Sequence, residues 1–368
     1  MTEKQMSNTN SSQLSHDAWY SFPGEENDIV LSTRVRLARN LADFTFPSQS
    51  NADEAERIQS LIFDSFSNME NPDSFQTIRL SNIDALGQRI LAERGMFPYP
   101  AYSFPWCGGI VRNDGKIACS VNYLDHIRIA SFISGFDCEK AYLTAHDIDS
   151  SLQEKLQFAA SPQMGYLTSN LKDLGSGMKL SAVLHLPSIT IAKIADKVFR
   201  ETTDTNCMVS VFFDPKEISA SGSFFLVQNK NSYCGDEGEQ LQNFQQTILR
   251  IAEYERGATM SLLETRPTRV KDSVYRAIAT LRYARFISRK EGLELISRIK
   301  WGLNLGILSG IEHNELTALL YRIQNAHLLY VSRNSSLDFE KDIITEDAKI
   351  DRLRSLVMQE ALSSVQIN

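Results

Sequence analysis

One stretch near the N-terminus, residues 28–40, constrains the fold of this chain more than any other. It reads Asp-Ile-Val-Leu-Ser-Thr-Arg-Val-Arg-Leu-Ala-Arg-Asn, and its apolar residues at 29, 31, 35 and 37 share one parity. Such alternation predicts a half-buried β-strand. Arg34 and Arg36 fall on the opposite parity, so their guanidinium groups would lie about 6–7 Å apart on one face. Two guanidiniums at that spacing can bind neighbouring phosphates, although the same pattern is also typical of a solvated sheet face.

The overall composition is that of an ordinary globular protein. The chain has 368 residues, with 42% hydrophobic and 23% charged residues, which suits about two domains. The net charge of −7 argues against a broad nucleic-acid-binding surface. No apolar run approaches the roughly 20 residues of a membrane span, and the polar N-terminus lacks a secretory signal. We therefore expect a cytoplasmic protein that binds neither nucleic acid nor membrane.

The five cysteines are odd in number, widely spaced and without a Cys-x-x-Cys pair. This pattern predicts neither a zinc site nor a disulfide framework. We expect reduced thiols, with Cys107, Cys119 and Cys138 serving as small buried apolar residues.

The first 260 residues alternate short strand patterns with a few long amphipathic helices. Two strand patterns follow closely between residues 117 and 132, which indicates a hairpin and therefore antiparallel pairing. This order predicts an α+β fold and not repeated βαβ units. The predicted strands cover residues 117–122, 126–132, 208–214 and 223–228, together with an apolar run that ends at residue 186. The predicted helices cover residues 52–69, 149–160 and 238–256, and another helix is predicted to start at Pro187-Ser188. Residues 95–110 are predicted to form an ordered loop.

From about residue 262 the pattern becomes helical throughout. Val274, Ile278 and Leu281 repeat at helical spacing, and Ser288 with Glu291 predicts a capping box. A charged stretch over residues 340–364 predicts a final helix. The chain therefore divides into a flexible tail over residues 1–24, an α+β domain over 25–260, a helical domain over 261–335 and a charged helical C-terminal segment over 336–368.

Four segments carry a resemblance to a known family. They are residues 28–40, Asn122 with Asp125-His-Ile-Arg-Ile129, Gly165-Tyr-Leu-Thr-Ser169, and Leu174-Gly-Ser-Gly-Met178 leading to His185-Leu-Pro187. In order and spacing they resemble the ATP:guanidino phosphotransferases, most closely the bacterial protein arginine kinases. The resemblance implies a catalytic domain at 25–260 with a twisted, mainly antiparallel sheet flanked by helices, followed by a helical domain. It also implies transfer of the γ-phosphoryl group of ATP, with Mg²⁺, to an arginine of a protein substrate, and a homodimer.

The resemblance assigns the arginine strand to the nucleotide. Arg34, Arg36 and Arg128 match phosphate-binding arginines of the family, and Lys179 stands where the family has another arginine. Lysine keeps the positive charge but loses the bidentate fork of arginine. The candidate nucleotide-binding residues are Ser32, Thr33, Arg34, Val35, Arg36, Arg128, Lys179, Ser181 and Val183.

Several positions depart from the family pattern. Tyr123 and Leu124 stand where the family has two glutamates, one of which is the base, and neither side chain can take a proton near neutral pH. Glu217 or Asp214 is the candidate replacement for a missing carboxylate. Asn170 stands where the family has a reactive cysteine, and Val211 stands where the family has a phosphate-binding arginine. An acidic stretch over residues 339–347 stands where the protein arginine kinases have a basic phosphoarginine-binding motif.

Two hypotheses remain open. In the first, the chain is a diverged but working protein-arginine kinase that uses its four basic residues on the triphosphate. In the second, it is a nucleotide-binding pseudokinase that acts by binding a partner protein. Because the family's acidic residues are missing, we assign no catalytic residue and predict weak or absent activity. Asp125, His126 and His185 are interpreted as structural residues.

Overall fold

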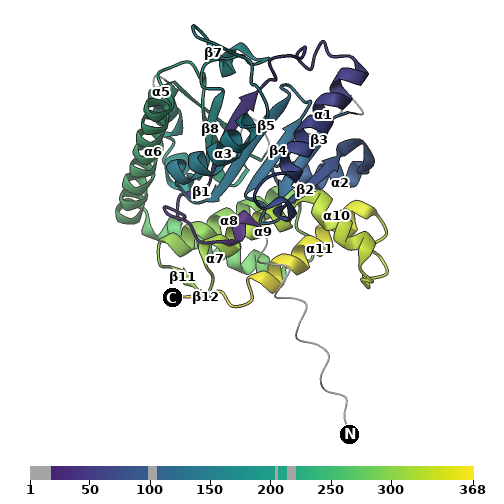
Figure 1. Cartoon of the computed structure of the whole chain (residues 1–368). Helices are drawn as coiled ribbons and strands as arrows, with labels where there is room; N and C mark the ends of the chain where they lie inside the picture. The colour runs from purple at the N-terminus through teal and green to yellow at the C-terminus, as the bar shows by residue number, and fades with distance from the viewer. Residues whose placement is uncertain (1–17, 98–105, 204–205, 214–220) are drawn as a thin grey trace.

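The computed structural model describes residues 18–97, 106–203, 206–213 and 221–368. Its centre is an eight-stranded sheet in the order β2-β3-β4-β5-β1-β8-β10-β9, in which neighbouring strands pair antiparallel. Helices flank this sheet, and a helical C-terminal region follows it (Figure 1). The predicted α+β class with a mainly antiparallel sheet is therefore confirmed.

The strands agree closely with the sequence patterns. The alternating stretch forms β1, the predicted hairpin forms β4 and β5, and the predicted strand over 208–214 ends at Val211, with residue 214 outside the described part of the chain. The sheet strands are β1 (Val30–Arg39), β2 (Phe75–Arg79), β3 (Gly108–Arg112), β4 (Ile117–Val121), β5 (Ile127–Ser134), β8 (Met178–His185), β9 (Cys207–Val211) and β10 (Phe224–Asn229). Two short pairs are β6 (Ala160–Ser161) with β7 (Gly165–Tyr166) and β11 (Leu308–Ser309) with β12 (Gln366–Ile367).

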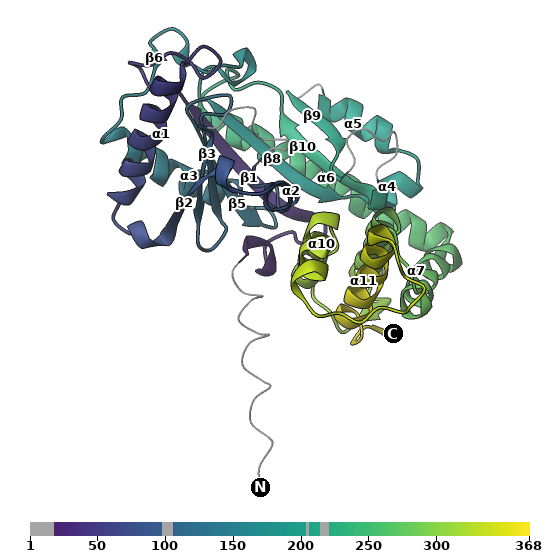
Figure 2. The ribbon, with the colours of Figure 1, turned by 90° about the vertical axis from the view of Figure 1, so that its right-hand side faces the viewer.

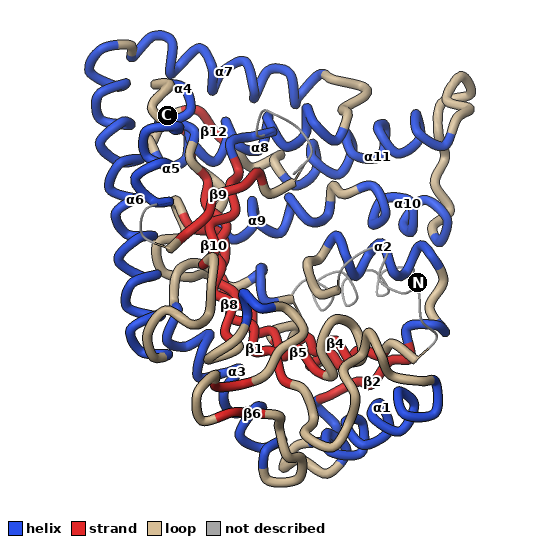
Figure 3. Tube along the Cα trace, turned by 90° about the horizontal axis from the view of Figure 1, so that it is seen from above, coloured by secondary structure: helices blue, strands red, loops and turns tan. Residues whose placement is uncertain are grey.

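The helices lie on both sides of the sheet. Figure 3 shows the strands as a layer between α1 and α3 on one side and α9, α10 and α11 on the other, and Figure 2 shows α7, α10 and α11 grouped beneath the sheet. The helices are α1 (Ala52–Ser67), α2 (Ala85–Glu93), α3 (Cys138–Gln153), α4 (Pro187–Ile191), α5 (Ala195–Thr203), α6 (Glu237–Thr265), α7 (Pro267–Tyr283), α8 (Arg289–Asn304), α9 (His313–Arg322), α10 (Asn325–Asn334) and α11 (Glu346–Ala361). The short 3₁₀ turns are η1 (Trp19–Ser21), η2 (Pro72–Ser74), η3 (Leu80–Asn82), η4 (Leu171–Asp173) and η5 (Ser221–Ser223).

Strand β1 separates two hydrophobic cores. Val35 and Leu37 point to the α3 side, where they join a core that includes residues of α1, α3 and α6. Leu31 of β1, Val183 of β8 and Phe224 of β10 instead join the core of the helices α7, α8, α9 and α11. The C-terminal helices are therefore packed directly onto the sheet, because side chains of three central strands contribute to their core.

Two predicted helices begin at other residues than expected. The helix predicted over 149–160 is α3, which starts at Cys138 because Asp137 accepts a hydrogen bond from the Lys140 N–H and caps it. The final helix, predicted over 340–364, is α11, which starts at Glu346 because Thr345 caps it. Ser288 caps α8 by accepting from the Glu291 N–H, which is one half of the predicted capping box. Both errors arise because a capping side chain, and not charge or hydrophobic spacing, determines where the first turn begins.

The predicted flexible tail is wrong for residues 18–24. Trp19 and Tyr20 are buried, Trp19 stacks on Phe132 of β5 with ring centroids 5.7 Å apart, and Tyr20 stacks on Tyr321 of α9 at 4.6 Å. These aromatic contacts join the N-terminal segment to the sheet and to the helical region. The buried Cys107, Cys119 and Cys138 are free thiols, as predicted. Within the described residues, no helix is long and apolar enough to cross a membrane.

Candidate functional site

The strand register places four predicted cationic residues on one face of the sheet. Arg36 of β1 lies opposite Lys179 of β8 and opposite Ala130 of β5, and Arg128 is two residues from Ala130 on the same strand. Residues directly opposite each other in antiparallel strands share a face, as do residues two apart. Arg34, Arg36, Arg128 and Lys179 are therefore brought together, on the side of the sheet that faces away from α3.

The arginines of this face are mostly buried and incompletely paired. The Nε atoms of Arg34 and Arg36 are buried without a hydrogen-bond partner. Burial, together with the nearby charges of Arg36 and Arg128, lowers the pKa of Arg34 to about 9. Burial and Arg128 lower the pKa of Arg36 to about 10, an effect that Asp173 opposes. Both guanidiniums stay protonated at neutral pH, so this face holds a concentration of positive charge with unused donors.

Two adjoining cavities open on these residues. A cavity of about 120 Å³ is lined by Ser32, Arg34, Arg36, Lys179, Ser181 and Val183, and it is closed by the aromatic side chains of Trp19, Phe132, Phe212 and Tyr321. A second cavity of about 250 Å³ shares Arg34 and Arg36 and adds Arg128, Ser120 and Tyr123. We call the two together the arginine cleft. All the predicted nucleotide-binding residues except Thr33 and Val35 line it.

Thr33 and Val35 lie on the opposite face of β1. The Thr33 hydroxyl donates a hydrogen bond to the Gly135 carbonyl oxygen at 2.7 Å, and Val35 is fully buried in the core beside α3. Because side chains alternate along a strand, these two side chains point away from the cleft. The structure therefore does not bring them together with the other seven.

Two aspartates at the cleft are already bound to arginine. Asp125 accepts hydrogen bonds from Arg128 Nε at 2.7 Å, Asn40 Nδ2 at 2.9 Å and the Ser169 N–H at 2.7 Å, so it is a structural carboxylate as predicted. Asp173 has Oδ2 at 3.3 Å from an Arg36 Nη atom and at 3.5 Å from an Arg128 Nη atom. Asp173 could not be recognised as a site residue from the sequence, because only the fold reveals that η4 lies beside β1 and β5.

The positions that depart from the family pattern supply no carboxylate in the described structure. Tyr123 lines the cleft and Leu124 is 45% exposed, whereas Asp214 and Glu217 lie outside the described residues. Asn170 caps the η4 turn by accepting from the Lys172 N–H at 3.1 Å. Val211 ends β9, at the edge of the sheet.

The remaining polar candidates have structural partners. Lys179 Nζ donates to the carbonyl oxygens of Asn229 and Lys230, and burial lowers its pKa. His126 Nδ1 accepts from the Leu41 N–H at 2.9 Å, and His185 Nε2 is 2.7 Å from the Ser297 hydroxyl. These contacts are compatible with the structural interpretation of the two histidines, which stays a prediction, and the ammonium of Lys179 is only partly available to a ligand.

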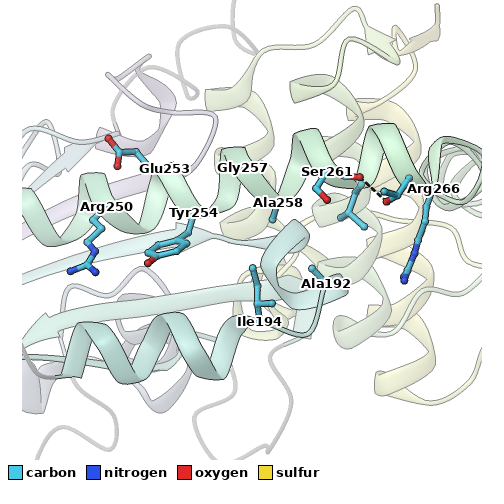
Figure 4. Close-up of a pocket in the computed structure, with 11 residues that line it drawn as sticks. Ala192, Ile194, Arg250, Glu253, Tyr254, Gly257, Ala258, Ser261 and Arg266 are labelled. Carbon is cyan, nitrogen blue, oxygen red and sulfur yellow. Dashed lines mark hydrogen bonds between the residues drawn. The ribbon is translucent and has the colours of Figure 1, made fainter.

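A larger hollow lies elsewhere in the molecule. A groove of about 660 Å³ runs between α6 and the connection from α4 to α5. Figure 4 shows Tyr254 and Arg250 of α6 on one side of it and Ala192 and Ile194 on the other. Its lining is a mixture of apolar and ordinary polar side chains without a cluster of like charges. The arginine cleft is smaller but holds the side chains that could bind a polyanion.

Comparisons with known proteins agree with this geometry. Residues 57–258 match the family model described as ATP:guanido phosphotransferase, C-terminal catalytic domain. The chain belongs to this family. Residues 267–368 match a second model, described as protein-arginine kinase McsB C-terminal domain, which covers the helical region. The resemblance recognised in the sequence is thus confirmed for both regions.

The similarity to curated relatives extends over nearly the whole chain. A protein-arginine kinase of Syntrophomonas wolfei is 33% identical over 344 residues, covering 92% of this chain and 93% of the relative. A protein-arginine kinase of Bacillus subtilis is 29% identical over 329 residues, covering 89% and 90% of the two chains.

Solved structures of the family share the fold. A crystal structure of lombricine kinase superposes with a TM-score of 0.57 at 15% identity, covering 63% of this chain and 67% of that one. A substrate-free duplicated taurocyamine kinase from Schistosoma mansoni gives 0.57 at 16% identity, covering 74% of this chain and 41% of that one. At these identities the likeness concerns the fold alone.

Proposed function

We propose that this member of the protein-arginine-kinase group binds a nucleoside triphosphate in the arginine cleft and transfers its phosphate to arginine weakly or not at all. The observation that carries the proposal is the convergence of Arg34, Arg36 and Arg128 beside carboxylates that are already bound to arginine. Such a protein would act in the cytoplasm by binding a partner protein, with the nucleotide as its ligand.

The unused donors support the nucleotide part of this proposal. A buried charge without a partner is costly, so Arg34 and Arg36 with unpartnered Nε atoms favour an anion in the cleft. Guanidinium forks match phosphate oxygens in geometry and charge. Bound ATP would bring the γ-phosphoryl group, and the same arginines would neutralise its charge.

Binding of Mg²⁺ is proposed to depend on the phosphates of the bound ATP. Within the described residues, no three His, Cys, Asp or Glu side chains cluster as a metal site. Mg²⁺ commonly keeps several waters and binds through one or two carboxylates together with substrate phosphates. We therefore propose that Mg²⁺ enters with ATP.

The carboxylates support the second part, that transfer is weak or absent. A guanidinium that attacks phosphorus must lose a proton to a base within hydrogen-bond reach. Asp125 accepts three hydrogen bonds and Asp173 is bound to two arginines. Tyr123 and Leu124 cannot replace a carboxylate, since phenol is a poor base near neutral pH and leucine has no acceptor.

The whole-chain likeness to curated protein-arginine kinases favours a second candidate, an active kinase. In that case Asp214 or Glu217 would supply the missing carboxylate, and the same arginines would hold the triphosphate. The two candidates share the nucleotide site and differ only in whether a proton acceptor reaches the substrate guanidinium.

One pair of measurements separates them. ATP binding with Mg²⁺ is measured by titration calorimetry for the wild-type chain, for Arg34→Met, and for Arg276→Met as a matched control. Arg276 is an exposed arginine on α7, paired with Asp272. The same proteins are incubated with Mg-ATP and an arginine-rich protein, and phosphoarginine is sought by mass spectrometry under conditions that preserve acid-labile phosphate.

The proposal expects ATP binding that is lost in Arg34→Met, kept in Arg276→Met, and accompanied by little or no phosphoarginine. Rapid arginine phosphorylation that depends on Arg34 would establish the active kinase instead. Absence of ATP binding in the wild-type chain would contradict both candidates.

A further inference from the structure

Asp173 occupies an unusual position in the arginine cleft. Its carboxylate is only 3% exposed, and Oδ2 lies between Arg36 and Arg128, at 3.3 and 3.5 Å from their Nη atoms. These distances are those of ion pairs in a mostly buried environment, where screening by water is weak. The carboxylate therefore neutralises the two arginines at the point where their guanidiniums approach each other.

The backbone around Asp173 holds the carboxylate in place. Asp173 ends the η4 turn, and its N–H donates to the Asn170 carbonyl oxygen at 2.8 Å. The preceding residue, Lys172, accepts from the Ser232 N–H at 2.8 Å through its carbonyl oxygen. The turn is thus fixed at its start by Asn170 and along its length by the segment after β10, so the carboxylate is positioned by the fold.

The two acidic residues of the cleft differ in what they hold. Asp125 binds the backbone at Ser169 and the Asn40 side chain as well as Arg128, so it joins three segments of the chain. The side-chain contacts that the described structure gives to Asp173 go only to Arg36 and Arg128. A role in joining segments therefore explains Asp125 but not Asp173.

We propose that Asp173 limits the affinity of the arginine cleft for anions: it is a resident anion whose carboxylate fills the position that a phosphate group would share between Arg36 and Arg128. A ligand must take over these two ion pairs to bind. The inference rests on the proposed nucleotide site and deepens it, because it states which part of that site is already filled. Arg34, which has no acidic partner within the described residues, is then the first free contact for an incoming phosphate.

The net charge of the cleft shows how Asp173 affects the affinity for anions. The cationic side chains that line the cleft are Arg34, Arg36, Arg94, Arg128 and Lys179, and with the carboxylates of Asp125 and Asp173 they give a net charge of 5 − 2 = +3. Replacing Asp173 by asparagine raises it to 5 − 1 = +4 with almost no change of side-chain size. The variant should therefore bind anions more tightly than the wild-type cleft.

The test is titration calorimetry with two probes, ATP and inorganic tripolyphosphate, against the wild-type chain, Asp173→Asn and Asp147→Asn. Asp147 is an exposed carboxylate on α3, the helix that covers the other face of the sheet, so its variant removes the same charge away from the cleft. We expect Asp173→Asn to bind both probes at least tenfold more tightly than the wild-type chain. We expect Asp147→Asn to match the wild-type chain within a factor of two.

Thermal unfolding provides a second measurement, which still tests the proposal if Asp173→Asn is less stable than the wild-type chain. Without anion, Asp173→Asn should unfold at a lower temperature than the wild-type chain, because Arg36 loses its acidic partner and Arg128 keeps only Asp125. Saturating tripolyphosphate should raise its melting temperature by more than it raises that of the wild-type chain. Equal affinities and equal melting shifts in the two proteins would overturn the role of Asp173 and leave the nucleotide site intact. Failure of both proteins to bind either probe would overturn the proposed function itself.

Discussion

Arg39 and Arg34 lie on the same strand, β1, and each leaves its Nε atom buried without a hydrogen-bond partner, yet within the described residues only Arg39 has an acidic partner. Arg39 points to the α3 side, where one Nη atom is 2.9 Å from Asp149 and another donates to the Ser176 carbonyl oxygen at 3.0 Å. Its guanidinium also lies 3.6 Å from the centre of the Tyr166 ring. Arg34 points to the cleft, where the described structure gives it the Phe132 ring at 5.0 Å but no acidic partner.

We interpret this difference as that between a structural arginine and an arginine that the proposed nucleotide would contact. Burying a guanidinium is unfavourable unless its charge and its donors are compensated. The fold compensates Arg39 internally, through α3 and the glycine-rich loop. It leaves Arg34 to be compensated by something from outside, and this unmet requirement is the physical basis for assigning a binding role to that face of the strand.

The largest expected effect is on stability, at Arg39. Arg39→Met leaves the buried Asp149 carboxylate without its partner, so we expect a loss of about 3–5 kcal/mol in the free energy of unfolding. Urea unfolding followed by circular dichroism measures it. The double variant Arg39→Met with Asp149→Leu should recover part of the loss, because it removes the uncompensated charge as well. A loss below about 1 kcal/mol in the single variant would mean that the pair is not structural.

The same substitution at Arg34 should weaken ATP binding and leave the free energy of unfolding nearly unchanged. Arg34→Met removes a buried charge that has no acidic partner, so the free energy of unfolding should stay within about 1 kcal/mol of the wild-type value or rise. Binding of ATP should weaken by at least about tenfold, since a charged hydrogen bond contributes roughly 1.5–3 kcal/mol. Urea unfolding and calorimetry are run on the same preparation. A large loss of stability with unchanged ATP affinity would remove the contrast with Arg39.

A third buried cation, Lys300 of α8, has only neutral partners and can lose its proton. Its Nζ donates to the Asn27 carbonyl oxygen at 2.5 Å and lies 3.1 Å from His313 Nδ1, and burial lowers its pKa to about 7. Burial also lowers the pKa of His313 to about 4, so that ring is neutral above pH 5.

The unfolded chain keeps the Lys300 proton up to about pH 10.4, whereas the folded chain releases it near pH 7. The folded state therefore loses stability as the pH falls from about 10 to 7, by up to about 1.4 kcal/mol per pH unit. Lys300→Met should remove this slope, which urea unfolding at several pH values would measure. Parallel pH profiles for the two proteins would show that Lys300 is not buried as the structure describes.

The smallest effect is expected at Lys179, the cationic residue of the cleft that already has partners. Its ammonium donates to the carbonyl oxygens of Asn229 and Lys230 at the end of β10. Lys179→Met should therefore weaken ATP binding by no more than about threefold, or roughly 0.6 kcal/mol, compared with the far larger loss for Arg34→Met. Calorimetry on the two variants compares them directly, and equal losses would show that pairing within the fold does not predict availability to a ligand.

The parts of this structure that depend on local periodicity could be predicted from the sequence. The alternation in residues 28–40 placed Arg34 and Arg36 on one face of a strand, and the short spacing between residues 117 and 132 indicated the β4–β5 hairpin. Both features follow from repeats of two residues and from a short connection, which are visible without knowledge of distant contacts.

The parts that depend on distant contacts could not be predicted in this way. Trp19 and Tyr20 read as part of a polar tail because their partners, Phe132 and Tyr321, lie far away in the chain. Asp173 read as an ordinary loop residue because nothing local indicates that η4 meets β1 and β5. Thr33 and Val35 were grouped with the cleft residues through the family motif, although the alternation along the strand already places them on the face opposite to Arg34 and Arg36.

The central place of β1 in the sheet has a consequence for how the protein is made. This strand leaves the ribosome first among the eight, but it pairs with β5 and β8, which are synthesised much later. Its two edges must remain unpaired in the nascent chain until then, and sheets built from such distant pairings form slowly. We therefore expect the growing polypeptide to depend on molecular chaperones until β8 has emerged.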